Sequence, residues 1–254
     1  MKKHIPVSNF AGKELLITGA AQRVGADAAR YLAGRGMNLD IHYRSSRDAA
    51  EALKSEIESE GIAQVNLAAG DLSKEEDVKA LFAEFSPDAV VHNAGTWGKG
   101  FEEDIQMNMH SAHYICKYGI ERALKDGKEL TIILTLDGFL VRGGVYDSSL
   151  IGYMMAKKSL EVLVVALAAE YGDRGIRVLG IASGPIQPGP DADQETIELY
   201  RRQINMPKPK LDPWIGGEYI GEAIFHLLHM TAVNGVIIPV DGARVWKAEG
   251  KEHK

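Results

Sequence analysis

The stretch Lys13–Gly25, with the sequence KELLITGAAQRVG, decides the fold. Its first part, Lys13–Thr18, is a short apolar run of the kind that forms a buried strand. Small residues follow at once, and apolar residues then recur at helical spacing from Val24 to Leu32. A strand, a glycine-containing turn and a helix in this order favour an α/β fold whose helix N-terminus can receive a pyrophosphate.

The same alternation continues along the chain. Further strands are predicted over Met37–Tyr43, Ile62–Ala68, Ala89–Val91, Leu130–Leu136, Ile176–Ile181 and Gly235–Val240. Helices are predicted over Ser46–Glu60, Asp71–Phe85, Phe101–Asp126 and Tyr153–Tyr171. Parallel strands need connections long enough to hold a helix, so this alternation predicts a Rossmann-type, doubly wound α/β fold with a seven-stranded parallel sheet.

No linker rich in proline, serine or charge divides these elements. We therefore expect one domain over residues 1–254, a length that one large α/β domain can use. The long interruption is Ser183–Pro213, which contains six prolines. A loop of that length in a compact domain is often functional, so residues 183–213 are expected to form a proline-rich substrate lid.

The composition narrows the class of protein. The chain is 45% hydrophobic and 25% charged, which excludes disorder, and its net charge of −6 gives no general attraction to nucleic acid or anionic membranes. Its longest apolar run, Val162–Ala169, is far shorter than the roughly 20 residues that span a bilayer. Without an apolar segment behind the basic start, we expect a cytoplasmic protein with a small-molecule substrate. A lone Cys116 makes no intrachain disulfide.

The end of the second strand indicates which dinucleotide binds. Its sequence is HYRSS, with Arg44 followed by Ser45 and Ser46, and it has no acidic residue. A carboxylate here would bind the ribose 2′-hydroxyl of NAD, whereas an arginine with two hydroxyls suits the 2′-phosphate of NADP. The cofactor is therefore predicted to be NADP(H). The alternatives are an ordinary strand-to-helix turn at Gly19 and a solvated Arg44.

Tyr153 and Lys157 are four residues apart and share one helix face. A nearby ammonium favours the phenolate, so we expect Lys157 to lower the pKa of Tyr153 towards neutral pH. Such a pair can supply a proton to a carbonyl or an imine as a hydride arrives. These two residues are therefore candidate catalytic groups.

Several ordered landmarks carry a family resemblance. They are Thr18-Gly19, Asp71-Leu72, His92-Asn93-Ala94-Gly95, Asn108, the Tyr153/Lys157 pair and Val240-Asp241-Gly242. Along nearly its whole length the chain resembles the short-chain dehydrogenase/reductase family.

The resemblance assigns roles to individual residues. It implies that Asp71 contacts the adenine, that Asn93 supports the cofactor-binding strands, and that Asn108 holds a water in a proton relay. It further implies that Lys157 binds the nicotinamide ribose. By the same resemblance the protein is expected to be a homotetramer or dimer, with the helices of Asn108 and Tyr153 packed between subunits.

Two departures from the family pattern resemble pteridine reductases and their bacterial dihydrofolate- and dihydromonapterin-reducing relatives. Arg23 replaces a turn glycine, and Asp137 stands where the family has its active-site serine. In addition, Trp97 lies four residues after Asn93, where the resemblance implies an aromatic side chain that stacks on a pterin. A carboxyl at Asp137 suits a substrate whose ring nitrogen accepts a proton.

Other features leave alternatives open. The spacing from Asp137 to Tyr153 predicts an enlarged loop over Gly138–Ile151, in which Ser148 or Ser149 could replace the missing serine. Leu150 sits where pteridine reductases often have a second tyrosine. The histidine pairs His110/His113 and His226/His229 lack a third ligand, so no metal site is expected. By the same resemblance, Arg244, Trp246 or Lys247 of the C-terminal tail could reach a neighbouring active site.

The leading hypothesis is an NADPH-dependent reductase of a pteridine-like C=N bond. The alternatives are a carbonyl reductase of the 3-oxoacyl-[acyl-carrier-protein] type and an inactive NADP-binding regulatory protein. The catalytic set is Asn108, Asp137, Tyr153 and Lys157, and the substrate set is Trp97, Asp137 and Tyr153. The cofactor-binding set is Gly19, Arg23, Val24, Gly25, Tyr43, Arg44, Ser45, Ser46, Asp71, Leu72, Asn93, Ala94, Gly95, Tyr153, Lys157, Gly184 and Ile186.

Overall fold

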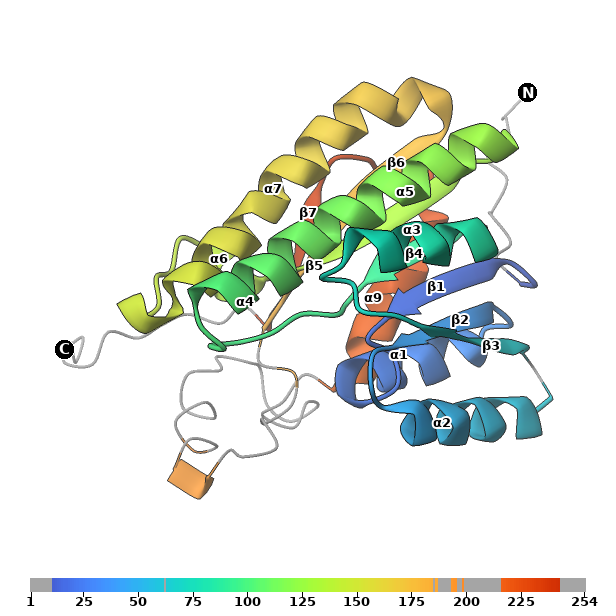
Figure 1. Ribbon diagram of the computed structural model, residues 1–254, viewed down its shortest axis with the longest axis horizontal. Coiled ribbons are helices and arrows are strands. Elements are labelled where there is room, and N and C mark those ends of the chain that lie inside the picture. The colour runs from blue at the N-terminus through green and yellow to red at the C-terminus, as the bar shows by residue number, and fades with distance from the viewer. Residues whose placement is uncertain are drawn as a thin grey trace, which may run out of the picture.

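A computed structural model describes residues 11–61, 63–184, 186, 193–195, 198 and 216–242. Its centre is a seven-stranded sheet in the order β3-β2-β1-β4-β5-β6-β7 (Figure 1). The strands are β1 (Glu14–Thr18), β2 (Asn38–Tyr43), β3 (Val65–Ala69), β4 (Ala89–His92), β5 (Leu130–Asp137), β6 (Ile176–Ser183) and β7 (Ile237–Val240). Every neighbouring pair is parallel, so the predicted fold class is confirmed.

Helices cover both faces of the sheet. One apolar layer joins the sheet to α1 (Arg23–Ala33), α2 (Arg47–Ser59) and α9 (Gly217–His229). The other joins it to α3 (Glu75–Glu84), α5 (Ser111–Asp126) and α7 (Ile151–Tyr171). The inner strands β1, β4, β5 and β6 are consequently buried on both sides, which is why they are nearly continuous apolar runs. Polar side chains that serve a site must then lie at the ends of strands.

Two segments differ from their predicted form. The helix expected over Phe101–Asp126 consists of α4 (Phe101–Ile105), a π-helical turn η1 (Gln106–His110) and α5. The loop expected over Gly138–Ile151 contains a short helix α6 (Gly138–Val141) and a 3-10 turn η2 (Ser148–Leu150). A further 3-10 turn, η3 (Gly172–Arg174), follows α7. The π-helical turn matters most, because such turns often occur at functional sites.

Some expectations lie outside the described residues. Most of the predicted lid over residues 183–213 does so, as do the C-terminal residues Arg244, Trp246 and Lys247. Within the described ranges, no helix is long and apolar enough to cross a membrane. Within the same ranges, no group of three or more His, Cys, Asp or Glu side chains is arranged to hold a metal ion.

Candidate active site

The predicted phosphate-binding turn joins β1 to α1 at the carboxyl edge of the sheet. Gly19 has a φ of +63°, a backbone conformation that residues other than glycine rarely adopt. A Cβ on Gly25 would lie 2.5 Å from the backbone oxygen of Gly19. Both glycines thus let α1 begin directly against the turn, and a helix N-terminus in such a place can receive a phosphate.

Arg23, the first residue of α1, has a φ of +55°. It is the one described residue other than glycine with a positive φ, which explains why a glycine suits this position in the family pattern. Its side chain is exposed beside the turn. The unusual backbone conformation therefore puts a positively charged residue, Arg23, in the turn that would bind a pyrophosphate.

His42, which sequence reasoning did not single out, fixes the turn to β2. Its Nε2 lies 3.1 Å from the backbone oxygen of Gly70, and its Nδ1 lies 3.2 Å from the backbone N of Gly19. Because a carbonyl only accepts, Nε2 carries the proton and Nδ1 accepts from Gly19. Burial lowers the pKa of His42 to about 4, so the ring stays neutral. A histidine that alternates with apolar residues in the strand NLDIHY, and therefore lies on the same side as Asp40, was the available signal.

A second buried histidine, His92 at the end of β4, likewise ties neighbouring elements together through both of its ring nitrogens. Ser111 Oγ donates to the backbone oxygen of Met107 (2.6 Å), so it must accept from His92 Nε2, 3.1 Å away. The unprotonated Nδ1 then accepts from Thr18 Oγ1 at 3.0 Å. Burial lowers the pKa of His92 to about 3, which matches this neutral form. The chain of hydrogen bonds links helix α5, β4 and β1.

Thr18 and Asn93 complete this connection. Thr18 Oγ1 accepts from the backbone N–H groups of Asn93 and Ala94, both at 3.0 Å. Asn93 Nδ2 donates to the backbone oxygens of Thr18 (3.2 Å) and Gly19 (3.3 Å). Asn93 thus lies where the family resemblance implies, holding the ends of β1 and β4 together under the turn.

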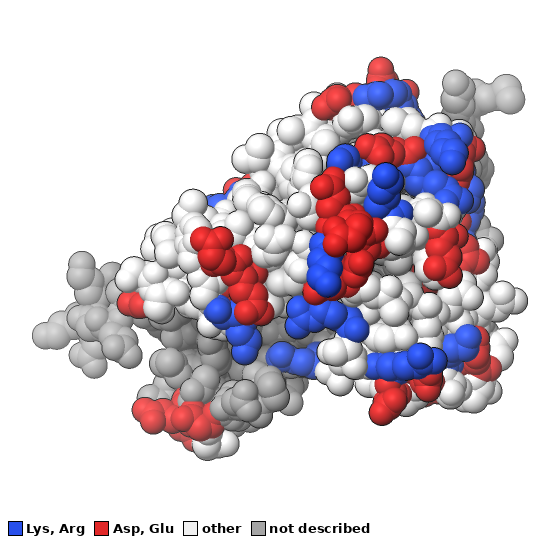
Figure 2. Space-filling model, viewed as in Figure 1, with Lys and Arg blue, Asp and Glu red and all other residues white. Residues whose placement is uncertain are grey.

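The end of β2 presents Tyr43, Arg44, Ser45 and Ser46. Arg44 and Ser45 are exposed, and Ser46 is the N-cap of α2 with no side-chain capping bond. An arginine and two serines thus directly precede a helix N-terminus, residue types that suit a phosphate, and the Arg44 guanidinium reaches towards Met107 (Nη1–Sδ 3.9 Å). Figure 2 shows a band of Lys and Arg side chains across the lower part of the described face, beside α2, although the chain as a whole is acidic.

The other predicted cofactor residues lie along the same edge. Asp71 Oδ1 accepts from Ser73 Oγ (2.7 Å), and although burial raises the pKa of Asp71, the Ser73 hydrogen bonds and the charge of Arg44 hold it below its usual value. Leu72 is fully buried and Val24 is half-buried. Ile186 is buried in the same apolar layer as α1. A Cβ on Gly184 would lie 2.8 Å from Asp241 Cα, so this glycine permits the close approach of the chain after β7.

Asn108 is buried in η1, and its side-chain nitrogen is held by two backbone oxygens. Its Nδ2 donates to the backbone oxygens of Thr96 (3.0 Å) and Asp104 (2.9 Å), which fixes the orientation of the amide because carbonyls only accept. Oδ1 is the buried side-chain polar atom that has no partner in the described part of the chain. A Cβ on Gly95 would lie 2.5 Å from this oxygen and 3.6 Å from Lys157 Nζ. An acceptor so placed fits the water-holding role that the resemblance implies.

Lys157 projects from α7 towards β5. Its Nζ donates to the backbone oxygen of Thr135 at 2.9 Å and lies 5.9 Å from the centre of the Tyr153 ring. Burial lowers the pKa of Lys157 to about 8, and the Asp137 carboxylate opposes this shift only in part. The ammonium is therefore easier to deprotonate than an ordinary lysine.

Asp137, the last residue of β5, binds Tyr153 directly. Asp137 Oδ2 accepts from the Tyr153 hydroxyl at 2.9 Å, and Oδ1 accepts from the backbone N of Leu140 at 2.9 Å. The aspartate at the position of the family serine is thus hydrogen-bonded to Tyr153. Ser148 and Ser149 are exposed in η2, and the structure does not bring them into this contact.

The predicted direction of the Tyr153 pKa shift is wrong. Burial and the neighbouring carboxylate of Asp137 raise the pKa of Tyr153 well above its usual value. The reason is geometric: the carboxylate oxygen lies at hydrogen-bond distance from the phenol, whereas the ammonium lies 5.9 Å from the ring centre. The hydroxyl therefore keeps its proton and is a donor.

Aromatic side chains surround this pair. The Trp97 ring lies edge-on to Tyr153, with centroids 4.5 Å apart, and edge-on to Tyr146, 4.9 Å apart. Tyr146 also donates to Asp137 Oδ2 at 3.0 Å. Trp97 is 45% exposed, so part of its ring remains open to a ligand. Tyr146 was not predicted, because nothing in the spacing of an irregular loop marks which residue turns inward.

The loop after β5 is tied to the end of the sheet. Arg142, just after α6, pairs with Asp241 through both carboxylate oxygens, one of them 2.9 Å from Nη2. Asp241 is only 2% exposed, so this pairing satisfies a buried charge. The landmark Val240-Asp241-Gly242 thereby anchors the segment that carries Tyr146.

The fold and the site together define a class. A glycine turn at a helix N-terminus, a strand end suited to phosphate, and a buried Tyr–Lys pair at one edge of a parallel sheet are the parts of a dinucleotide-dependent oxidoreductase.

Comparison with known proteins gives the family. The family model described as "Enoyl-(Acyl carrier protein) reductase" matches residues 19–242. A glucose 1-dehydrogenase of Gluconobacter oxydans is 31% identical over 255 residues, which cover 92% of each chain. A 3beta-hydroxysteroid dehydrogenase 1 of Eggerthella lenta is 34% identical, covering 78% of this chain and 81% of the relative.

A solved structure agrees in fold. That of a 3-oxoacyl-[acyl-carrier protein] reductase from Brucella melitensis superposes with a TM-score of 0.81, covers 98% of each chain and is 19% identical. The chain belongs to the short-chain dehydrogenase/reductase family of oxidoreductases, whose members use nicotinamide cofactors.

Proposed function

We propose that this protein interconverts a carbonyl group and a hydroxyl group on a small molecule, with NADP(H) as the cofactor. The observation that carries the proposal is the buried Tyr153 hydroxyl, which keeps its proton beside Lys157 at the edge of the sheet that holds the phosphate turn. The relatives are named for such reactions, acting on glucose, on a 3β-hydroxysteroid and on a 3-oxoacyl group.

Each residue contributes one step to this chemistry. Bound NADPH supplies the hydride. Tyr153 donates its proton to the oxygen that becomes the hydroxyl, and the Lys157 ammonium stabilises the phenolate that forms. Asp137 holds the phenol in place until the substrate competes for its hydrogen bond. Asn108 Oδ1 and Lys157 Nζ both lie close to Gly95, so this oxygen can accept from a water that returns a proton to the pair.

The test is turnover on a chemical panel. The purified protein with NADPH is offered a 3-oxoacyl thioester, a steroid ketone and an aldehyde or ketone of sugar type, and NADPH oxidation is followed. We expect reduction of at least one carbonyl, with a loss of about 100-fold or more in Tyr153→Phe. Tight NADPH binding with no turnover of any carbonyl or pterin would contradict an enzymatic function and favour a regulatory cofactor-binding protein.

A second candidate is reduction of a pteridine-like C=N bond. The observation in its favour is Asp137 at the serine position, together with a half-exposed Trp97 that can stack on a flat ring. Neither relative above is named for a pterin. Turnover of a dihydropterin at a higher kcat/KM than every carbonyl in the panel would establish this candidate, whereas no pterin turnover with active ketone reduction would remove it.

The preference for NADP rests on Arg44. Because only NADPH carries the 2′-phosphate, Arg44→Ala should raise the Kd for NADPH by about 10- to 100-fold and leave the Kd for NADH within about twofold. Isothermal titration of both cofactors measures this. Lys54→Ala, on the exposed side of α2, is the matched control. An equal loss of affinity for both cofactors would remove the basis for the preference.

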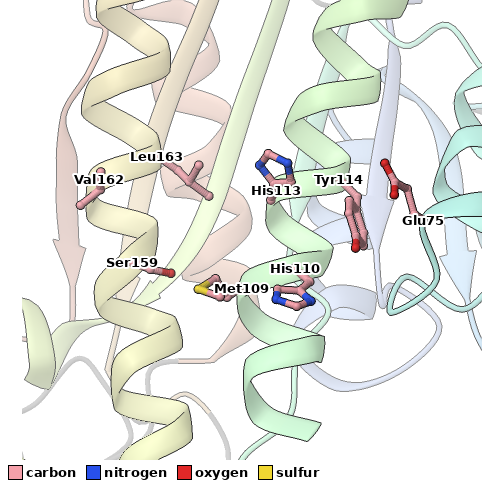
Figure 3. A pocket seen from close by; sticks show the side chains of 8 residues that line it. All are labelled: Glu75, Met109, His110, His113, Tyr114, Ser159, Val162 and Leu163. Carbon is pink, nitrogen blue, oxygen red and sulfur yellow. The ribbon is translucent and has the colours of Figure 1, made fainter. Parts of the chain in front are cut away.

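We further propose that two or more copies associate through α5 and α7. A surface hollow of about 620 Å³ lies along these helices; it is lined by Met109 and His110 of η1, by His113 of α5 and by Ser159, Val162 and Leu163 of α7 (Figure 3). Apolar residues on the outer side of α7 are exposed, Val162 by 68% and Val165 by 57%. Contiguous exposed apolar surface of this kind is typical of a protein interface.

A further inference from the structure

Tyr146 lies in the irregular segment between α6 and η2 and turns into the site. Its hydroxyl donates to Asp137 Oδ2 at 3.0 Å, and its backbone N lies 3.2 Å from Met154 Sδ on α7. Its ring packs against Trp97 and against Phe139, with centroids 4.9 Å and 4.8 Å apart. The enlarged loop therefore delivers one more phenol to the residue that holds Tyr153.

The two oxygens of Asp137 are not equivalent. Oδ1 accepts from the backbone N of Leu140 as the N-cap of α6, which prevents the carboxylate from rotating. Both phenols consequently donate to the same atom, Oδ2, Tyr153 from 2.9 Å and Tyr146 from 3.0 Å. One carboxylate oxygen thus divides its negative charge between two neutral donors.

We propose that Tyr146 is a positioning residue that allows Tyr153 to release its proton to the substrate. The inference rests on the proposed function, since it assigns a new residue to the proton-donating step of that reaction. While Tyr153 donates to the substrate, Tyr146 keeps Oδ2 hydrogen-bonded, so the buried carboxylate does not lose both partners at once. An unpartnered buried carboxylate is costly, and Tyr146 removes much of that cost from the reaction.

Tyr146 also weakens the resistance to phenolate formation. When Tyr153 has given up its proton, two anionic oxygens lie about a hydrogen-bond length apart. A phenol that donates to Oδ2 disperses the carboxylate charge and so reduces this repulsion. Lys157 contributes from α7, where its Nζ donates to the backbone oxygen of Thr135 and lies 5.9 Å from the centre of the Tyr153 ring. Tyr153 therefore has both a cation and a hydrogen-bonded carboxylate in its surroundings.

The hydroxyl and the ring of Tyr146 can be tested separately. Tyr146→Phe removes only the hydrogen bond to Asp137 and keeps the ring contacts with Trp97 and Phe139. Tyr146→Leu removes both. Tyr171→Phe, in the last residue of α7, deletes a phenol far along the same helix and is the matched control.

The kinetic experiment measures kcat and KM with the best substrate of the panel. Tyr146→Phe should lower kcat about tenfold, as expected for one hydrogen bond to a charged group, and leave KM within about twofold. Tyr146→Leu should in addition raise KM and shift the fluorescence of Trp97. Tyr171→Phe should leave kcat, KM and the Trp97 fluorescence unchanged. A kcat of Tyr146→Phe equal to that of the unmodified protein, or a loss confined to KM and melting temperature, would overturn the proposal.

A second readout needs no substrate. In protein labelled with ¹³C at the tyrosine Cζ, the Tyr153 signal, assigned by its absence in Tyr153→Phe, reports the hydrogen bond of its hydroxyl. Tyr146→Phe should shift this signal, because Tyr153 becomes the sole phenol donor to Oδ2, whereas Tyr171→Phe should leave it in place. An unmoved signal would overturn the coupling between the two phenols. Failure of the proposed function would instead appear as a shifted signal in a protein that reduces no substrate.

Discussion

The buried polar residues at the strand ends have fixed hydrogen-bonding roles. Thr18 Oγ1 accepts hydrogen bonds from two backbone N–H groups and donates its own proton to His92 Nδ1. The hydroxyl therefore has no further donor or acceptor capacity. A proton on His92 Nδ1 would face an oxygen whose lone pairs are already used. Burial and this hydrogen-bond pattern thus agree in keeping the ring neutral, and the turn that they support stays rigid.

The low pKa of Lys157 makes the proposed reaction sensitive to alkali. Burial lowers that pKa to about 8, so the ammonium is present below about pH 8 and is lost as the pH rises through that value. A neutral amine cannot stabilise the Tyr153 phenolate, so kcat for carbonyl reduction should fall about tenfold per pH unit above about 8. The pH profile of kcat at saturating substrate measures this. A profile that stays flat across this range would contradict the assignment.

At the scale of the element, helix α1 depends on its close approach to the turn. Gly25→Ala would place a Cβ 2.5 Å from the backbone oxygen of Gly19 and 2.9 Å from Asn93 Nδ2. The helix must then move away from the turn, so the Kd for NADPH should rise more than about 100-fold and unfolding should become easier by about 2 kcal/mol. Gly34→Ala, where the nearest atom is 3.4 Å away, is the control and should change neither. Cofactor titration and urea unfolding measure both effects.

The periodicity of apolar residues was enough to predict which segments are strands and which are helices. It did not predict the π-helical turn η1 or the short helix α6. The inner strands β1, β4, β5 and β6 are largely apolar on both faces, and that pattern is local and visible in the chain. The π-helical turn at Gln106–His110 is different, because it is specified by partners far away in sequence: Gln106 Nε2 donates to the backbone oxygen of Ser73 at 2.6 Å. Similarly, the short helix α6 exists because Asp137 caps it, a role that residue type alone does not reveal.

The site was predictable where it follows ordered motifs. Tyr153, Lys157, Asn108 and Asp137 were found from spacing and resemblance, and the structure gathers them around β5 and α7. His42 and Tyr146 were not found, because their roles depend on which direction a side chain takes after the chain has folded. The direction of the Tyr153 pKa was also missed, since sequence spacing shows the ammonium and does not show that the carboxylate is nearer.

At the scale of the whole molecule, all the strands run in one direction and therefore end at one edge. The turn after β1, the phosphate-suited end of β2, Asn93 after β4 and Asp137 at the end of β5 consequently share that edge. Helices α5 and α7 leave the same region side by side in Figure 1. A surface that joins copies of the chain through these helices would act directly on the elements that carry Asn108 and Tyr153.

The proposed association through α5 and α7 can be tested with a single substitution that introduces a charge. Val162→Glu introduces a carboxylate at an apolar side chain that is 68% exposed and lines the hollow of Figure 3. Because burying an unpaired charge is costly, the variant should dissociate to single chains where the unmodified protein is a dimer or tetramer. Light scattering after gel filtration measures the mass of each. Val236→Glu, just before β7, is the control and should keep the original mass. Since α7 holds Tyr153 and α5 continues directly from η1, which holds Asn108, dissociation should also lower kcat. An unmodified protein that is already a single chain would contradict the proposed assembly.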